Sequence, residues 1–252
     1  MLLQHKTAVV YGAGGFVGGA IARAFAREGA TVHLAGRTAA TLRVVADDIA
    51  AAGGQTHVAV VDALNEAEVD AHAAAVVERS GTLDILVNVI SDQDVQGTPV
   101  VEMPVEDYLR PVEVAVRSKF LTWRAAARHM IRQGSGVILA FGGTFDWKVA
   151  RRLRVGGIGT TFDAVEAMRR QLAAEVGPHG IRVVTLRTGG LPETIPADFQ
   201  GYEQVREFLV EQTLTGRAAT LADVGNLAAF AASELACTVT GTINMTAGAA
   251  LD

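Results

Sequence analysis

Cysteine, aromatic side chains and long apolar runs are all scarce in this sequence. Cys237 is the only cysteine among 252 residues, which excludes an intrachain disulfide and a cage of thiolate metal ligands and fits a reducing cytoplasm. No apolar run approaches the roughly 20 residues of a membrane-spanning helix, and residues 1–6 are too short a segment for a signal peptide. We therefore expect a cytoplasmic protein without a membrane partner.

Charge is limited as well, and neither sign dominates any segment. The chain carries 22 Lys and Arg against 27 Asp and Glu, and it has no block of like charge, which argues against nucleic acid as a partner. The six histidines are scattered without the spacing of metal ligands, so no metal site is expected. Half of the residues are hydrophobic, which is enough to build one large core.

Short apolar segments alternate with helical patterns along the chain. The apolar segments are typical of strands covered on both faces, and they lie at residues 7–10, 31–34, 57–61, 85–89, 137–141, 182–186 and 242–245. The helical patterns lie at residues 20–28, 40–51, 66–79, 105–132, 163–176 and 221–233. This alternation predicts an α/β fold, a doubly wound, parallel, seven-stranded and Rossmann-like sheet in a single three-layer domain over residues 1–252.

A glycine-rich stretch joins the first predicted strand to the first helix. Gly12, Gly15 and Gly18 follow at three-residue intervals. Gly12 would make the turn, Gly15 would admit a pyrophosphate close to the backbone, and Gly18 would let the helix pack against the strand. The free N–H groups at the start of such a helix attract phosphate. A glycine-rich loop that binds nothing is the alternative, but the strand before it and the helix after it favour a dinucleotide site.

The end of the second predicted strand indicates which dinucleotide binds. An acidic residue there would hold the ribose 2′-hydroxyl of NAD, but this chain has Arg37 and Thr38. A cation suits the 2′-phosphate of NADP(H), unless Arg37 is merely a solvated residue at the start of a helix. Asp62, after the third strand, would bind the adenine amino group or, alternatively, cap the next helix.

With these motifs in view, the chain resembles the single-domain short-chain dehydrogenases/reductases over nearly its whole length. The stretches that carry the resemblance are Ile21–Ala30, Asp84–Asn88, Leu172–Val183 and the region from Gly216 to Gly241. Phe16 departs from the family, because single-domain members usually have glycine there. The resemblance implies a cofactor site made of Gly12, Gly14, Gly15, Phe16, Val17, Gly18, Arg37, Thr38, Asp62, Ala63, Asn88, Val89, Ile90, Gly189 and Thr194.

The catalytic residues of the family do not carry over to this chain. Family members reduce carbonyls with a tyrosine acid, a lysine that lowers the pKa of that tyrosine, a serine and an asparagine. The positions that match are Ile158, Phe162, Gly143 and Ala115, in that order. None of the three tyrosines lies between residues 144 and 162. The usual proton relay is therefore expected to be absent, and the catalytic residues remain unknown.

Other polar groups near this region are candidates for the missing chemistry. Asp146 and Lys148 are candidate proton donors or substrate anchors, and residues 91–94 form a polar loop on the expected cofactor side. Thr144, Thr160 and Thr161 offer hydroxyl groups, and Arg151, Arg152 and Arg154 offer positive charge. The alternative for each of these side chains is an ordinary solvated surface residue, and the alternative for residues 91–94 is an ordinary polar loop.

The segment at about 190–215 occupies the place of the family's substrate lid. Its apolar residues Phe199, Tyr202, Phe208 and Leu209 favour a small, partly hydrophobic substrate, unless they pack as core.

Two functions follow from these features. The first is an NADP(H)-dependent oxidoreductase that reduces a C=C or C=N bond, because such a step asks less of the protein as acid. The second is a non-catalytic NADP(H)-binding sensor or inactive partner subunit. The family resemblance also implies a homo-oligomer, a dimer or tetramer, for which Val112, Val116, Phe120, Trp123 and Met168 are candidate contacts unless they face their own sheet.

Overall fold

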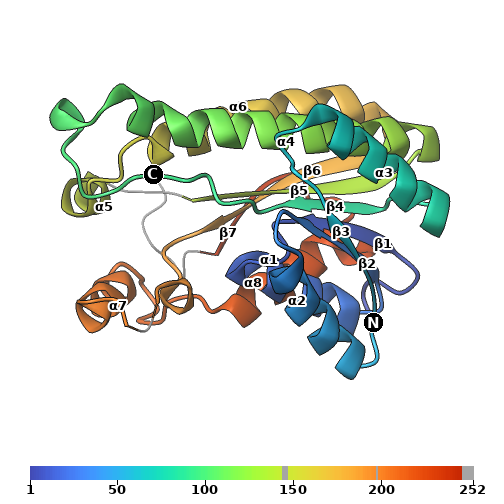
Figure 1. Cartoon of the computed structure of the whole chain (residues 1–252), viewed down its shortest axis with the longest axis horizontal. Helices are drawn as coiled ribbons and strands as arrows, with labels where there is room; N and C mark the ends of the chain where they lie inside the picture. The colour runs from blue at the N-terminus through green and yellow to red at the C-terminus, as the bar shows by residue number, and fades with distance from the viewer. Residues whose placement is uncertain (144–146, 197, 246–252) are drawn as a thin grey trace.

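The computed structural model describes residues 1–143, 147–196 and 198–245, and the side chains of all of these except residues 147–149. Its seven strands form one parallel sheet in the order β3-β2-β1-β4-β5-β6-β7, which confirms the predicted doubly wound, Rossmann-like sheet (Figure 1). The strands are β1 (Thr7–Tyr11), β2 (Thr31–Gly36), β3 (Gln55–Val60), β4 (Ile85–Asn88), β5 (Gly136–Gly143), β6 (Ile181–Thr188) and β7 (Gly241–Met245).

Helices cover both faces of this sheet (Figure 1). One layer contains α1 (Phe16–Arg27), α2 (Ala39–Ala51) and α8 (Leu221–Ala232), and the other contains α3 (Glu66–Ser80), α4 (Val105–Gln133) and α6 (Ile158–Val176). Each layer buries its own apolar cluster against the sheet. Because both faces are covered, the central strands β1 and β4 are buried on both sides, as the sequence indicated, whereas the edge strand β3 leaves Val58 and Val60 exposed.

Two helices begin earlier than the apolar periodicity predicts, and two were not predicted. The helix α1 begins at Phe16 instead of residue 20, and α6 begins at Ile158 instead of residue 163. The first turns of both contain glycine or threonine, which are weak helix formers, so tertiary packing decides these starts. The unpredicted helices are α5 (Trp147–Leu153) and α7 (Tyr202–Glu211). No helix in the described part of the chain is long and apolar enough to cross a membrane.

A buried acid ties α6 to the last two strands. Glu166 accepts hydrogen bonds from Nε and Nη2 of Arg169 at 2.7–3.0 Å and from the Thr185 hydroxyl of β6 at 2.8 Å. Thr242 of β7 donates a longer one at 3.3 Å. Burial raises the pKa of the Glu166 carboxyl, but the hydrogen bonds from Arg169 and Thr185 outweigh it and hold that pKa below its usual value. Glu166 is therefore a charged anchor inside this layer.

The apolar residues proposed as oligomer contacts differ in burial, and Val112, Val116 and Met168 are half-buried. Trp123 is fully buried in the core of its own layer, so its place is the alternative one, facing the sheet. Phe120, on the same helix α4, is half exposed.

Candidate functional site

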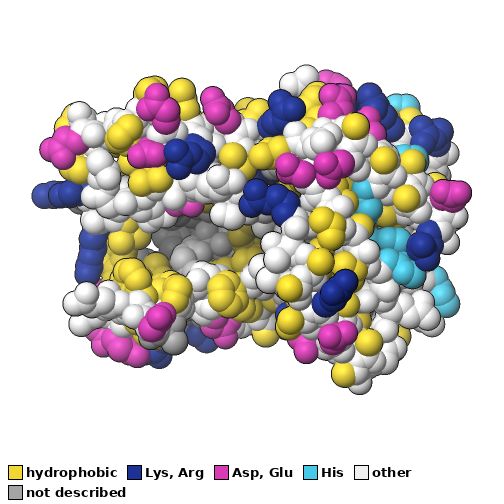
Figure 2. All heavy atoms as spheres, viewed as in Figure 1, with side chains coloured by type: hydrophobic (Ala, Val, Ile, Leu, Met, Phe, Trp, Pro, Cys, Tyr) yellow, Lys and Arg dark blue, Asp and Glu magenta, His cyan; other side chains and the backbone are white. Residues whose placement is uncertain are grey.

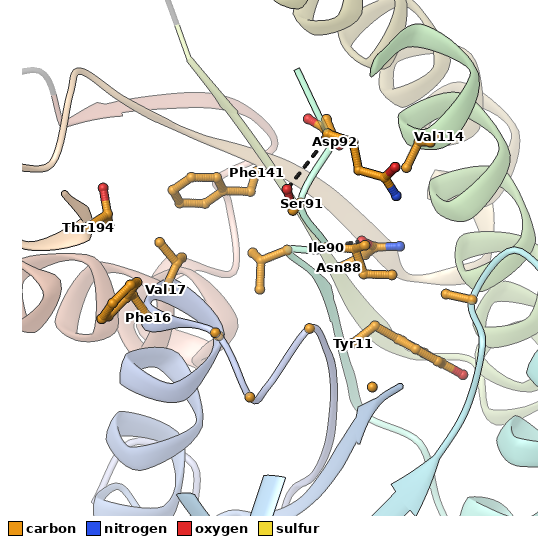
Figure 3. Close-up of a pocket in the computed structure, with 18 of the residues that line it drawn as sticks. Tyr11, Phe16, Val17, Asn88, Ile90, Ser91, Asp92, Val114, Phe141 and Thr194 are labelled. Carbon is orange, nitrogen blue, oxygen red and sulfur yellow. Dashed lines mark hydrogen bonds between the residues drawn. The ribbon is translucent and has the colours of Figure 1, made fainter. Parts of the chain in front are cut away.

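A cavity of about 710 Å³ opens at the carboxyl ends of the central strands. The order of the sheet reverses between β1 and β4, and ligands of doubly wound folds bind at such a switch point. All fifteen residues predicted to hold the cofactor line this cavity. Figure 3 shows Phe16 and Val17 on the α1 side, Thr194 near them, and Asp92 and Val114 across the opening. On the molecular surface, a hollow separates α7 from the layer of α4 (Figure 2).

The glycines of the first turn have the conformations that the sequence predicts. Gly12 has a φ of +84°, which favours glycine, and a Cβ there would come within 2.8 Å of the Val89 carbonyl oxygen. A Cβ at Gly18 would collide with the backbone of Gly12, so α1 packs on the turn at backbone distance. A Cβ at Gly15 would meet only the Gly12 carbonyl oxygen, at 3.5 Å. Glycine at position 15 therefore leaves open space on the cavity side of the loop, and it is not needed to avoid a clash within the loop.

The start of α1 supplies backbone donors to the cavity. The N–H of Gly15 bonds the Gly12 carbonyl, and the first bond of the helical ladder runs from the Gly19 N–H to Gly15. The N–H groups of Phe16, Val17 and Gly18 precede this ladder, so they lack intrahelical acceptors. No acidic residue stands in the first turn of α1. This helix end therefore presents a positive dipole and free donors to an anion.

Arg37 and Thr38 lie at the cavity edge after β2, and both are exposed. Within residues 1–143, 147–196 and 198–245, the Arg37 guanidinium has no hydrogen-bond or ion-pair partner, so its charge is available to a ligand. Asp62, after β3, does not cap α3. Asn65 does so, accepting hydrogen bonds from two N–H groups of the first turn, while Asp62 accepts from the Leu64 N–H at 3.0 Å. The helix-cap alternative for Asp62 is thus wrong.

Asn88 shapes the wall after β4. Its amide Nδ2 donates to the Thr122 hydroxyl at 3.0 Å, and its Oδ1 accepts from the Ile90 N–H at 3.2 Å. The side chain is fully buried, so it holds the turn that carries Val89 and Ile90 into the cavity. Across the cavity, the Thr194 hydroxyl donates to the Leu191 carbonyl at 2.8 Å and fixes the loop after β6.

Apolar side chains line the cavity where α6 meets β5. Ile158 and Phe162, one helical turn apart, both face the cavity, beside Phe141 of β5. A Cβ at Gly143 would collide with the Phe162 ring, so the ring fills the space that a side chain at position 143 would need. Ala115 is fully buried in the core. The apolar wall that the sequence predicted at Ile158 and Phe162 is present.

We predict that Gly143→Ser alone destabilises the protein by about 1–3 kcal/mol, because it overpacks this contact. The same change made together with Phe162→Ala costs less than the sum of the two single changes. Urea unfolding of the four proteins gives the coupling energy. Strict additivity of the two effects would show that position 143 has room of its own.

Sequence reasoning missed one charged group of the cavity, Lys119. Its Nζ lies 2.9 Å from Oδ1 of Asp92, and the two side chains are 3% and 13% exposed. Burial raises the pKa of the Asp92 carboxyl, an effect that Lys119 opposes. The signal that could have found Lys119 is its place on α4 one turn after Ala115, on the buried face of that helix.

Of the other polar candidates, residues 91–94 line the cavity, whereas Thr160, Thr161 and the arginines of residues 151–154 do not. Thr144 and Asp146 lie outside the described residues, as does the side chain of Lys148. Thr160 bonds the Tyr108 hydroxyl at 2.7 Å, and the Thr161 hydroxyl donates to the Gly157 carbonyl. The two threonines thus have structural partners.

The arginines near α5 make contacts of their own. Arg152 stacks over the Phe208 ring of α7, 4.1 Å from its centroid, and Arg154 donates to the Gly97 carbonyl at 3.3 Å. Phe208 is buried, whereas Phe199 is half exposed.

Comparison with known proteins agrees with this geometry. A family model described as enoyl-(acyl carrier protein) reductase matches residues 12–248. L-rhamnose 1-dehydrogenase (NAD(P)(+)) of Azotobacter vinelandii is 30% identical over 247 residues, which cover 96% of this chain and 94% of that protein. The chain belongs to the short-chain dehydrogenase/reductase family. A 7α-hydroxysteroid dehydrogenase of Escherichia coli K12 is 28% identical, with 98% of this chain and 94% of that one covered.

The solved structures give the same result for this short-chain dehydrogenase/reductase. A 7α-hydroxysteroid dehydrogenase in complex with NADH and 7-oxo glycochenodeoxycholic acid superposes with a TM-score of 0.84. It is 26% identical, and the match covers 99% of this chain and 96% of that one. The chain is thus an oxidoreductase of this family by both sequence and fold.

Proposed function

We propose that this protein is an NADP(H)-dependent oxidoreductase acting on a small, partly hydrophobic substrate. The observation that supports this most strongly is the convergence of all fifteen predicted cofactor residues on one cavity. The free N–H groups of α1 fit a pyrophosphate, and the unpaired Arg37 fits a 2′-phosphate. The nicotinamide, when bound, supplies the hydride. The chain's own residues bind, orient and exclude water.

The position of the substrate follows from the same cavity. Ile158, Phe162 and Phe141 form the apolar wall, and the lid segment at about 190–215 includes α7, which Arg152 holds through Phe208. We propose that these groups cover an apolar part of the substrate. We also propose that the family's tyrosine–lysine relay is absent, since its positions are Ile158 and Phe162.

Arg37→Ala is predicted to weaken NADPH binding by about 10–100-fold, because a charge-assisted contact to the 2′-phosphate is lost. NADH affinity should change less than threefold. Titration of bound-nicotinamide fluorescence measures both. Arg43→Ala, at an exposed position of the helix α2 that follows Arg37, is the matched control and should leave both affinities unchanged. Failure of the unmodified protein to bind NADPH, NADP⁺, NADH or NAD⁺ would contradict the proposal.

A non-catalytic NADP(H)-binding protein is the second candidate, and one specific observation favours it. Phe162 occupies the space that a serine at position 143 would use, so the usual constellation does not fit this wall. Tight NADPH binding without reduction of any carbonyl, enone or imine tested would favour this candidate.

A further inference from the structure

The Lys119–Asp92 pair lies in the wall of the proposed reaction cavity. Its two partners come from different elements, α4 and the loop after β4, and both line the cavity together with Ile158 and Phe162. Burying an ion pair is costly unless its geometry is good, and the 2.9 Å contact meets that condition. An ion pair at the protein surface would avoid the cost of burial. We therefore look for a role of this buried pair in the cavity.

The other ionisable groups of the described wall are engaged or belong to the proposed nucleotide end. Besides Asp92 and Lys119, that wall contains four ionisable groups: Tyr11, Arg37, Asp62 and Asp94. The Tyr11 hydroxyl bonds Nδ1 of His72 at 2.9 Å, and its ring points away from Ile90 and Val17 (Figure 3). Burial, the larger cause, and the Asp70 charge raise the pKa of that phenol far above its usual range. Asp94 accepts a hydrogen bond from Gln96 at 2.6 Å.

The identity of the buried cation is informative as well. The chain has nineteen arginines and three lysines, yet the buried cation of this wall is a lysine, while Arg37 at its edge is exposed. A guanidinium makes the better fixed ion pair with a carboxylate, but it does not release a proton in proteins. An ammonium can donate a proton and return as an amine. A lysine at position 119 is therefore better suited to proton transfer than to serving only as the ion-pair partner of Asp92.

We propose that the Lys119 ammonium is the proton donor to a carbonyl oxygen of the substrate and that Asp92 is its positioning residue. This inference rests on the proposed function and narrows its substrate class to carbonyl compounds, including enones. As hydride reaches carbon, an electron pair moves onto the carbonyl oxygen. An N–H bond of Lys119 breaks, an O–H bond forms, and the ammonium becomes an amine. Water at the partly exposed Asp92 side returns the proton.

The first test compares variants in NADPH oxidation with 9,10-phenanthrenequinone and 2-cyclohexen-1-one as probes. Lys119→Met should lower kcat/KM by 100-fold or more, within the range of general acid catalysis. Lys119→Arg keeps the charge and the pairing but should lose a similar factor. Lys6→Met, at a partly exposed lysine outside the cavity, is the matched control and should stay within twofold of the unmodified protein. The double variant Asp92→Asn/Lys119→Met avoids a lone buried charge, should Lys119→Met fold poorly.

The second test needs no turnover. Acylation of the three lysines by an amine-reactive reagent, followed peptide by peptide with mass spectrometry, should show that NADPH protects Lys119 and leaves Lys6 unchanged.

The outcomes separate this inference from the proposed function. Loss of turnover in both Lys119 variants, with NADPH affinity kept within threefold and Lys119 protected, supports it. Undiminished turnover in Lys119→Arg overturns it and leaves the proposed oxidoreductase standing. NADPH binding without reduction of either probe overturns it and favours the non-catalytic candidate. Failure of the unmodified protein to bind NADPH overturns both proposals.

Discussion

Gly18→Ala is expected to lower NADPH affinity by at least 30-fold and to destabilise the protein by about 1–3 kcal/mol. The added Cβ collides with the Gly12 backbone, which no change of rotamer can relieve, so α1 must move away from the turn. The N–H groups at the start of α1 move with it. Fluorescence titration and urea unfolding measure the two effects.

Gly19→Ala is the matched control for this change. A Cβ there would meet the flexible end of Arg23 at 2.8 Å and a Val45 methyl at 3.2 Å, so small shifts accommodate it. In the interior of a helix, alanine is also more favourable than glycine by about 1 kcal/mol. Equal NADPH affinity in the two variants would show that the close packing at Gly18 has no bearing on the site.

Glu166→Ala is expected to destabilise the protein by about 3–5 kcal/mol, because it leaves the buried Arg169 guanidinium without its carboxylate. Glu175→Ala, on the exposed side of the same helix α6, should change the free energy of unfolding by less than about 0.5 kcal/mol. Urea unfolding at pH 7 measures both. NADPH affinity should be retained at 25 °C, since Glu166 does not line the cavity. A change for Glu166→Ala as small as that for Glu175→Ala would contradict the assigned role.

The pH dependence of this contribution follows from the lowered pKa of Glu166 in the folded protein. The stabilisation is fully present above the pKa of an unfolded glutamate, about 4.3. It is lost as the pH falls below that value and through the lower pKa of the folded state. The difference in stability between the unmodified protein and Glu166→Ala should therefore shrink in acid.

Much of the fold and of the nucleotide end could be predicted because their signals are local. Gly12 and Gly18 both belong to the short connection from β1 into α1. A connection this tight leaves few alternatives to glycine at these two positions. The role of Arg37 stays a prediction, because a free guanidinium at a cavity edge fits a phosphate without proving one. The starts of α1 and α6 were missed because packing, not propensity, extends them.

The part of the cavity proposed to hold the substrate could be predicted less fully, because its contacts join segments that are distant in the sequence. Asp92 and Lys119 are 27 residues apart in sequence, and no spacing rule pairs a loop carboxylate with a helix lysine. The sequence places Asp92 in a polar loop, but no feature of the α4 sequence marks Lys119 as a residue of the cavity. The mutual fit of Gly143 and Phe162 was likewise invisible until α6 was placed against β5.

This mutual fit also limits how the chain can change over generations. A serine at position 143 meets the Phe162 ring. A side chain at position 143 therefore needs a smaller residue at position 162 at the same time. Substitution at either position therefore depends on the residue at the other, which favours keeping the present pair.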